Sequence, residues 1–168
     1  MAGSNIARIT RHLVANRARV GRAFPATSLA KIEAAITASE KTHAGQIRVV
    51  IEGALDGAPL FRGQIAQARA LDVFALQRVW DTAHNNGVLI YLLLADRDVE
   101  IVADRGIHAH VGASGWEDIC RTMEQAFMRG DFEAGVLAGI AAVTRHLGTH
   151  FPQGGADGNE LPDDVVVI

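Results

Sequence analysis

Cysteine is almost absent from this 168-residue sequence, which contains only Cys120. One cysteine cannot form a disulfide within the chain, and the start of the sequence lacks the basic flank and apolar run of a signal peptide. We therefore expect a reducing, cytoplasmic location. The longest apolar run, residues 88–95, is far shorter than the roughly 20 residues that span a bilayer. It predicts a buried strand instead.

Lysine is also scarce, with only Lys31 and Lys41, and the net charge is −3. Such a chain has no general positive field, so we expect no nucleic-acid partner. The sequence has no glycine-rich phosphate loop, and Ser114 and Cys120 are explained by a helix cap and an apolar stripe, which leaves no pair of nucleophile and base. Covalent catalysis therefore has no candidate residues.

The sequence divides into three parts by composition. Residues 1–24 include a basic amphipathic segment, with five arginines between positions 6 and 22. This segment is either a surface for anionic lipid or an acidic partner, or an ordinary helix packed on its own domain. Residues 25–152 carry the regular apolar patterns of one folded domain. Residues 153–168 predict a flexible acidic tail, whose end at 165–168 can still dock as an edge strand.

Apolar residues recur at helical spacing in the central part, and short apolar runs separate these segments. We predict helices over 28–45 and 64–80, a helix that starts at 114 and another that is capped by Asp131. We predict strands over 47–51, 88–94 and 99–102, the last two joined as a hairpin, with 88–94 in the sheet centre. This order places helices on both faces of a small mixed sheet, which is a three-layer α/β/α sandwich.

Acidic and amide side chains gather around the predicted hairpin. They are Asn85, Asn86, Asp96, Asp98, Glu100 and Asp104. Hard oxygen ligands of this kind suit calcium or magnesium. The alternative is a solvated hairpin with aspartates at turn positions, and the spacing does not decide between the two.

Two pairs of histidines have a spacing that zinc can use. His108 and His110 share a face if extended, and His146 and His150 share a face if helical. Neither pair has a third ligand nearby, and Leu147 stands where the zinc-protease pattern needs a glutamate. We interpret all four as surface or partly buried histidines.

Residues 85–91 (NNGVLIY), Asp96-Arg97 and residues 104–107 (DRGI) resemble the core signature of the TPM domain family. Trp116 and the segments 130–132, 150–152 and 159–163 are similar to the soluble bacterial branch of this family, so the resemblance covers about residues 25–165. It implies an α/β/α sandwich, in agreement with the pattern of helices and strands. It also implies a LemA-type membrane protein as partner.

The resemblance further implies calcium binding, with calcium preferred to magnesium, and acid phosphatase activity in a plant chloroplast relative. By position it makes Asn86, Asp96 and Asp104 the expected metal ligands, with Asn85 and Asp98 as weaker candidates. Many relatives have a glutamate just before the first strand, where this chain has Gln46. A neutral amide is a poorer calcium ligand, so we expect a weaker or differently built site.

Three functions are consistent with these residues. The first is a divalent-metal-binding accessory module, in which Asp96 and Asp104 hold an ion that organises loops for a protein partner. The second is a weak metal-dependent acid phosphatase, in which a metal-bound water attacks a phosphate ester and Asp98 is the base. The third is a non-catalytic scaffold whose basic segment, residues 6–22, docks on an acidic partner or on the anionic surface of the inner membrane.

Overall fold

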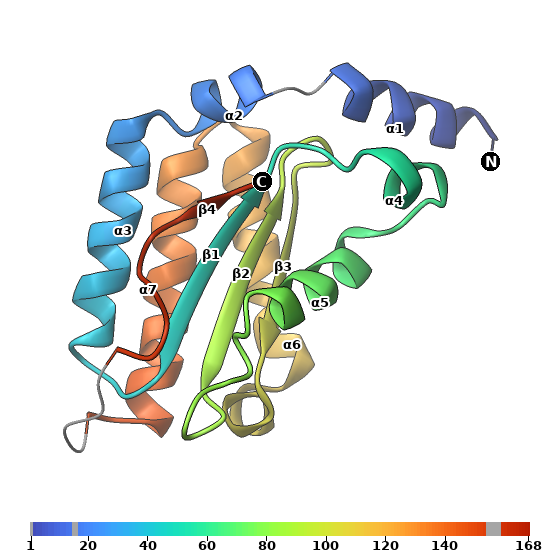
Figure 1. Ribbon diagram of the computed structural model, residues 1–168. Helices are drawn as coiled ribbons and strands as arrows, with labels where there is room; N and C mark the ends of the chain where they lie inside the picture. The colour runs from blue at the N-terminus through green and yellow to red at the C-terminus, as the bar shows by residue number, and fades with distance from the viewer. Residues whose placement is uncertain (1, 15–16, 154–158) are drawn as a thin grey trace.

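A four-stranded mixed sheet forms the centre of the computed structural model, which describes residues 2–14, 17–153 and 159–168 (Figure 1). The strands are β1 (Gln46–Glu52), β2 (Gly87–Leu93), β3 (Asp98–Ala103) and β4 (Val166–Val167). Their order is β3-β2-β1-β4. β1 is parallel to β2 and β4, whereas β2 and β3 form the predicted antiparallel hairpin.

Helices cover both faces of this sheet (Figure 1). One face carries α2 (Arg17–Ala23), α3 (Ala26–Glu40), α6 (Arg105–Met128) and α7 (Phe132–His150), whose apolar residues form one core. The other face carries α5 (Ala66–Leu76) and α4 (Gly57–Phe61), and α1 (Ala2–Val14) lies beside α4. The fold is therefore the predicted α/β/α sandwich.

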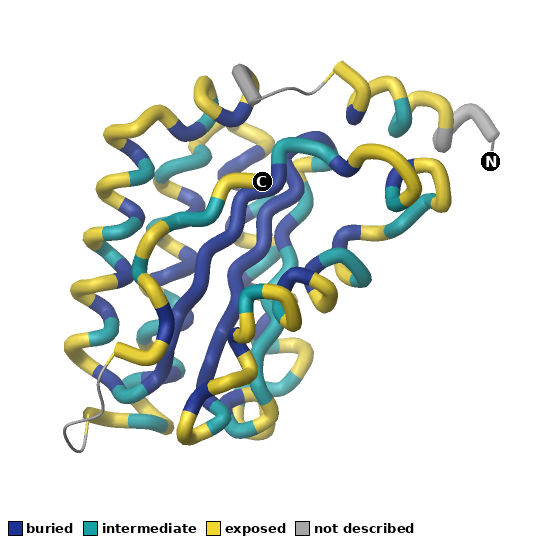
Figure 2. Tube along the Cα trace, in the orientation of Figure 1, coloured by how far each residue is buried: buried dark blue, intermediate teal, exposed yellow. Residues whose placement is uncertain are grey.

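The two central strands are buried over their whole length (Figure 2). Successive side chains of a strand point to opposite faces, so β1 and β2 supply residues to both cores. This explains why residues 88–94 are continuously apolar rather than alternating. The predicted central position of that strand is confirmed.

Some helix boundaries differ from those expected from the sequence. The basic segment forms two helices, α1 and α2, and residues 15–16 between them lie outside the described residues. Residues 57–61 form the short helix α4, although Gly57 and Pro59 are typical of a turn, and α5 is shorter than the predicted 64–80. α6 begins at Arg105 because the Asp104 side chain caps it, and it bends at Gly112, where φ is 72° and ψ is 168°.

The C-terminal segment lies along the sheet wherever it is described. Residues 154–158 of the predicted flexible tail are outside the described residues, but Val166 and Val167 pair with β1 as the predicted edge strand. The Gln46 side-chain oxygen accepts the backbone N–H groups of Glu160 and Leu161, both at 3.0 Å. Gln46 therefore fixes the start of this segment at the entrance of β1.

Candidate functional site

The β2–β3 hairpin separates the predicted metal ligands into two groups. Val88 pairs with Ala103 at one end and Leu93 with Asp98 at the other. Asn85, Asn86 and Asp104 therefore lie at the first end, and Asp96 and Asp98 at the second. A six-residue strand is about 20 Å long, so a single ion cannot contact both Asp96 and Asp104. The expectation that these two residues hold one ion is therefore wrong. Metal binding at either end alone stays a prediction.

Asp96, in the hairpin turn, is surrounded by cationic side chains of α1. Its Oδ2 accepts a hydrogen bond from Arg8 Nε at 2.8 Å, and its Oδ1 accepts one from an Arg11 terminal nitrogen at 2.7 Å. His12 Nε2 lies 3.1 Å from Oδ2, close enough for an ion pair although the N–H is not aligned for a hydrogen bond. Asp96 thus anchors α1 to the hairpin.

The charge of Asp96 is already matched by these partners. Burial alone would raise the pKa of this carboxyl, but the contacts from Arg11, Arg8 and His12 outweigh burial and lower it. His12 is buried and its Nδ1 accepts the Leu55 backbone N–H at 2.9 Å, so the ring hydrogen on Nε2 faces Asp96. A metal ion at Asp96 would have to displace α1.

The opposite end of the hairpin has buried oxygen atoms to which no described residue donates. Asn86 is fully buried; its side-chain amide donates to the Ala44 carbonyl at 3.1 Å, and its Oδ1 has no hydrogen-bond partner among the described residues. Asp104 Oδ1 accepts the Arg105 N–H at 2.6 Å, and its buried Oδ2 likewise has no partner there. An unpaired buried acceptor destabilises a fold by about 1–3 kcal/mol, so this end offers two oxygens that a cation would satisfy.

The backbone holds these two residues on adjoining segments. The Asp104 N–H donates to the Gly87 carbonyl at 2.9 Å, and the Ile107 N–H donates to the Asn85 carbonyl at 3.3 Å. A Cβ at Gly106 would lie 2.5 Å from that Asn85 carbonyl oxygen, so only glycine allows this approach. This explains why the 85–87 and 104–107 motifs occur together.

Glu40, at the end of α3, contributes a further buried carboxylate near the entrance of β1. Its Oε1 accepts the Ile47 N–H at 2.9 Å, whereas its Oε2 is buried without a partner among the described residues. Burial, with the negative charge of Asp163 as a smaller cause, raises the pKa of Glu40 to about 8. The sequence analysis missed Glu40, because nothing in the pattern of a helix end marks a buried carboxylate.

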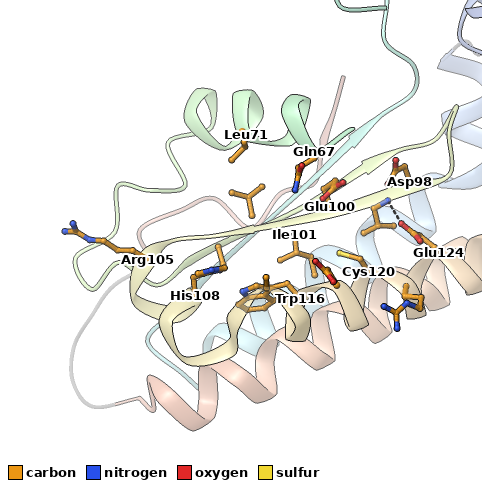
Figure 3. A pocket seen from close by; sticks show the side chains of 16 residues that line it. Gln67, Leu71, Asp98, Glu100, Ile101, Arg105, His108, Trp116, Cys120 and Glu124 are labelled. Atoms are coloured by element: carbon orange, nitrogen blue, oxygen red, sulfur yellow. Dashed lines mark hydrogen bonds between the residues drawn. The ribbon is translucent and has the colours of Figure 1, made fainter. Parts of the chain in front are cut away.

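A groove of about 650 Å³ runs between α5, β3 and α6 (Figure 3). Asp98 and Glu100 of β3 and Glu124 of α6 line it, with Trp116 at its wall. Burial, together with the neighbouring carboxylates, raises the pKa of Asp98 to about 6 and that of Glu100 to about 7. Asp98, predicted as a metal ligand or base, therefore belongs to this groove.

Two other arrangements bear on the sequence predictions. Glu52, Arg69 and Tyr91 form a buried network that was not predicted: Arg69 Nε lies 2.8 Å and the Tyr91 hydroxyl 2.7 Å from Glu52 Oε2. The four histidines of α6 and α7 are exposed or half-buried, as predicted, and the rings of His110 and His150 stack at 4.4 Å. Among the described residues, no three or more His, Cys, Asp or Glu side chains are grouped to hold a metal.

Comparison with known proteins identifies relatives of this chain. A family model described as TPM domain matches residues 22–146. The solution structure of BA42 protein from the psychrophilic bacterium Bizionia argentinensis is 30% identical, with a TM-score of 0.73, over 86% of this chain and 94% of BA42. The N-terminal domain of a P. gingivalis protein is 20% identical, with a TM-score of 0.61, over 78% of this chain and 82% of that domain, and it shows the fold alone.

The curated proteins include none that matches this chain. Across residues 2–14, 17–153 and 159–168, no helix combines the length and the apolar character needed to cross a membrane. The family model, however, matches most of the chain, and the matched range includes the hairpin and α6. The chain belongs to the TPM domain family.

Proposed function

We propose that this TPM domain is a divalent-cation-binding accessory module, with the ion held where residues 85–87 meet residues 104–107. The observation that supports it is the pair of buried oxygens, Asn86 Oδ1 and Asp104 Oδ2, that have no donor among the described residues. A calcium ion accepts carboxylate, amide and backbone carbonyl oxygens in a flexible geometry. The residues at this end of the hairpin therefore fit a hard cation, as the family resemblance leads us to expect.

The affinity of this site should be low. Of Asn86 and Asp104, only Asp104 carries a charge, and the Gln46 oxygen already accepts two backbone N–H groups. Calcium affinity falls with the number of charged ligands, and sites with few of them bind at about 0.1–1 mM. Such a site responds to changes in the concentration of free calcium in the millimolar range.

An accessory role follows from what the ion would connect. It would tie the loop before β2 to the first turn of α6, and so fix the surface formed by both segments for a protein partner. A LemA-type membrane protein remains the predicted partner. No contact favours the phosphatase alternative, because Asp98, its expected base, lies at the opposite end of β3 from Asp104.

Thermal unfolding of chelator-treated protein, with and without 10 mM calcium, tests the site. At ten to a hundred times the dissociation constant, bound calcium adds about 1.4–2.7 kcal/mol to the free energy of unfolding. In a domain of this size, the melting temperature then rises by about 3–10 °C. Magnesium, which demands a stricter octahedral geometry, should give a smaller rise.

Asp104→Asn is the decisive variant, because asparagine still caps a helix while it removes the charge. It should fold and lose the calcium response. Asp131→Asn, the same change at the N-terminus of α7, and Asp96→Asn in the hairpin turn should keep the response. If Asp104→Asn responds like the unmodified protein, the proposed position of the ion is wrong; if Asp96→Asn alone loses the response, the ion binds at the hairpin turn.

A further inference from the structure

The groove beside β3 follows the free edge of the sheet. β3 is the outermost strand among those described, and every residue of β3 lines the groove. The Asp104 N–H points inward to Gly87 of β2. Since N–H groups alternate along a strand, those of Val99, Ile101 and Ala103 point outward into the groove. This edge can therefore pair with a further strand.

The outward N–H groups of Val99 and Ile101 are poorly satisfied by the acceptors that α6 supplies. The Val99 N–H meets Glu124 Oε1 at the long distance of 3.3 Å. The Ile101 N–H hydrogen-bonds the sulfur of Cys120, which is a poor acceptor. A peptide strand can place a carbonyl at the usual distance of about 2.9 Å from each N–H group, so it would replace one long and one weak hydrogen bond with two of ordinary length.

Carboxylates flank this edge from both sides of the sheet. Asp98 and Glu100 alternate along β3 on the side of α5, and Glu117 and Glu124 reach it from α6. Figure 3 shows Asp98 and Glu124 toward one end of the groove, and Arg105 and His108 toward the other. Burial raises the pKa values of Asp98 and Glu100, and the neighbouring carboxylates raise them further because like charges repel one another. A cation among them would relieve this repulsion.

Trp116 provides a second sign of a ligand. It is only 4% exposed, it lines the groove, and its indole Nε1–H has no hydrogen-bond partner among the described residues. A buried tryptophan N–H normally has an acceptor. A metal ion or a simple polyamine carries no such acceptor, whereas a peptide has one at every residue.

We propose that this groove receives an extended lysine- or arginine-bearing segment of a partner protein, which adds a strand to β3 and places its cations among Asp98, Glu100 and Glu124. A second copy of the chain does not fit, because its own β3 would bring the same carboxylates against them. The basic helix α1 of the same chain does not supply these cations, because its Arg8 and Arg11 are bound to Asp96. The acidic side chains thus protect the edge from self-association and select a basic partner.

The test uses isotope-labelled protein and the synthetic hexapeptide Lys-Val-Lys-Val-Lys-Val, with Glu-Val-Glu-Val-Glu-Val for comparison. The basic peptide should bind saturably and shift the amide signals of β3 and the facing turns of α6. The chain has two tryptophans, so the indole signal of Trp116 should move while that of Trp80 stays in place. Methylation of the peptide nitrogens on one edge should weaken binding about tenfold, as expected for lost main-chain hydrogen bonds.

Variants separate charge in the groove from charge elsewhere. Glu100→Gln combined with Glu124→Gln should weaken the basic peptide at least about tenfold, and Trp116→Phe should weaken it while keeping the ring. Asp81→Asn, an exposed carboxylate paired with Arg78, removes charge outside the groove and should leave the affinity unchanged. Equal binding of both peptides, shifts that avoid β3, or spermine binding as tightly as the peptide would each overturn the proposal.

Discussion

Single acidic residues of this domain behave differently because of their immediate surroundings. Asp96 is held by cationic side chains, which lower its pKa despite burial. Glu100 and Glu40 are half-buried without such partners, and burial raises their pKa values to about 7 and about 8. A carboxyl group therefore anchors a helix in one place and keeps its proton near neutral pH in another.

The raised pKa of Glu100 predicts a pH-dependent stability. An unfolded glutamate loses its proton near pH 4.3, whereas folded Glu100 keeps it to about pH 7. The folded state therefore binds more protons between these values, so stability falls as the pH rises from about 4 to 7. Glu100→Gln should remove part of this fall, on the order of 1 kcal/mol once solvent screening is allowed for, or about 2–4 °C in melting temperature.

Melting curves at pH 5 and pH 8 measure this effect. The matched control is Asp118→Asn, an exposed carboxylate of α6 that pairs with Arg121. The two variants should differ in how steeply their stability changes with pH. An identical slope for Glu100→Gln and the unmodified protein would show that Glu100 ionises normally.

The sequence indicated which residues of the hairpin are candidate site residues, but not which other residues they contact. The motifs at 85–87 and 104–107 were correctly expected at neighbouring strand ends, because strand boundaries follow from the apolar pattern. Asp96 was assigned to the wrong end, since a residue at a turn lies one full strand length from the residue that ends the next strand. Glu40 carried no signal, and Trp116 was noted only as part of the family resemblance, because burial of a single polar atom depends on tertiary packing.

Among the elements, α1 depends most on one contact. Isolated helices of this length are marginal in water, and Ile6, Leu13 and Val14 of α1 are exposed. Its attachment comes from Arg8, Arg11 and His12 at the hairpin and from the packing of Ile9 against the smaller core. We therefore expect α1 to detach from the domain when its contacts with Asp96 are lost.

Asp96→Ala should detach α1. Without the carboxylate, Arg8 and Arg11 lose their counter-charge and the buried Nε2–H of His12 loses its nearest acceptor, and an unpaired buried polar group destabilises a fold by about 1–3 kcal/mol. Hydrogen exchange of residues 6–14 should then approach the rate of an unfolded chain, while β1 and β2 keep their protection. Asp98→Ala, two positions away with no contact to α1, should leave the exchange of α1 unchanged; equal loss in both variants would contradict the anchor.

Elements were predicted well where one face is apolar and poorly where local capping decides. The strands and the bodies of α3, α5 and α7 follow from apolar spacing. The first turns of α6 were missed because the cap at Asp104 and the bend at Gly112 interrupt the pattern. The helix α4 was interpreted as a turn, since a glycine and a proline within three residues normally mark one.

At the scale of the whole molecule, the segment 159–168 covers one edge of the sheet and binds the buried guanidinium of Arg48. Arg48, in the middle of β1, is only 6% exposed. Its guanidinium donates to the Pro162 carbonyl at 2.6 Å and to the Asp164 carbonyl at 2.9 Å. The C-terminal segment therefore supplies hydrogen-bond acceptors to the Arg48 guanidinium in addition to covering the sheet.

Removal of residues 159–168 should strongly destabilise the domain. Arg48 would keep only Gln77 as an acceptor among the described residues, and β1 would lose its pairing with β4 and the packing of buried Leu161. Loss of one buried leucine side chain alone costs about 2–5 kcal/mol. Urea unfolding of the shortened and full chains measures the difference in free energy of unfolding. Arg48→Met in the shortened chain should recover part of the loss, whereas no recovery would show that the pairing of β4, rather than the charge, matters.

The topology could be predicted only in part. The α/β/α layers and the hairpin follow from the order of elements. The parallel addition of β4 to β1, by contrast, joins Val50 to Val166 across 116 residues, and no local pattern specifies a pairing over such a separation. The role of Arg48 became clear only from that pairing.

The long separation between β1 and β4 also matters during synthesis. While the ribosome extends the chain beyond β2, the outer edge of β1 has no strand beside it, because residues 166 and 167 have not yet emerged. At about 5–20 residues per second, the nascent sheet waits several seconds with Arg48 uncovered. A charged side chain at an open edge discourages pairing with other nascent chains. Arg48 therefore disfavours incorrect pairing at the outer edge of β1 until the C-terminal segment binds there.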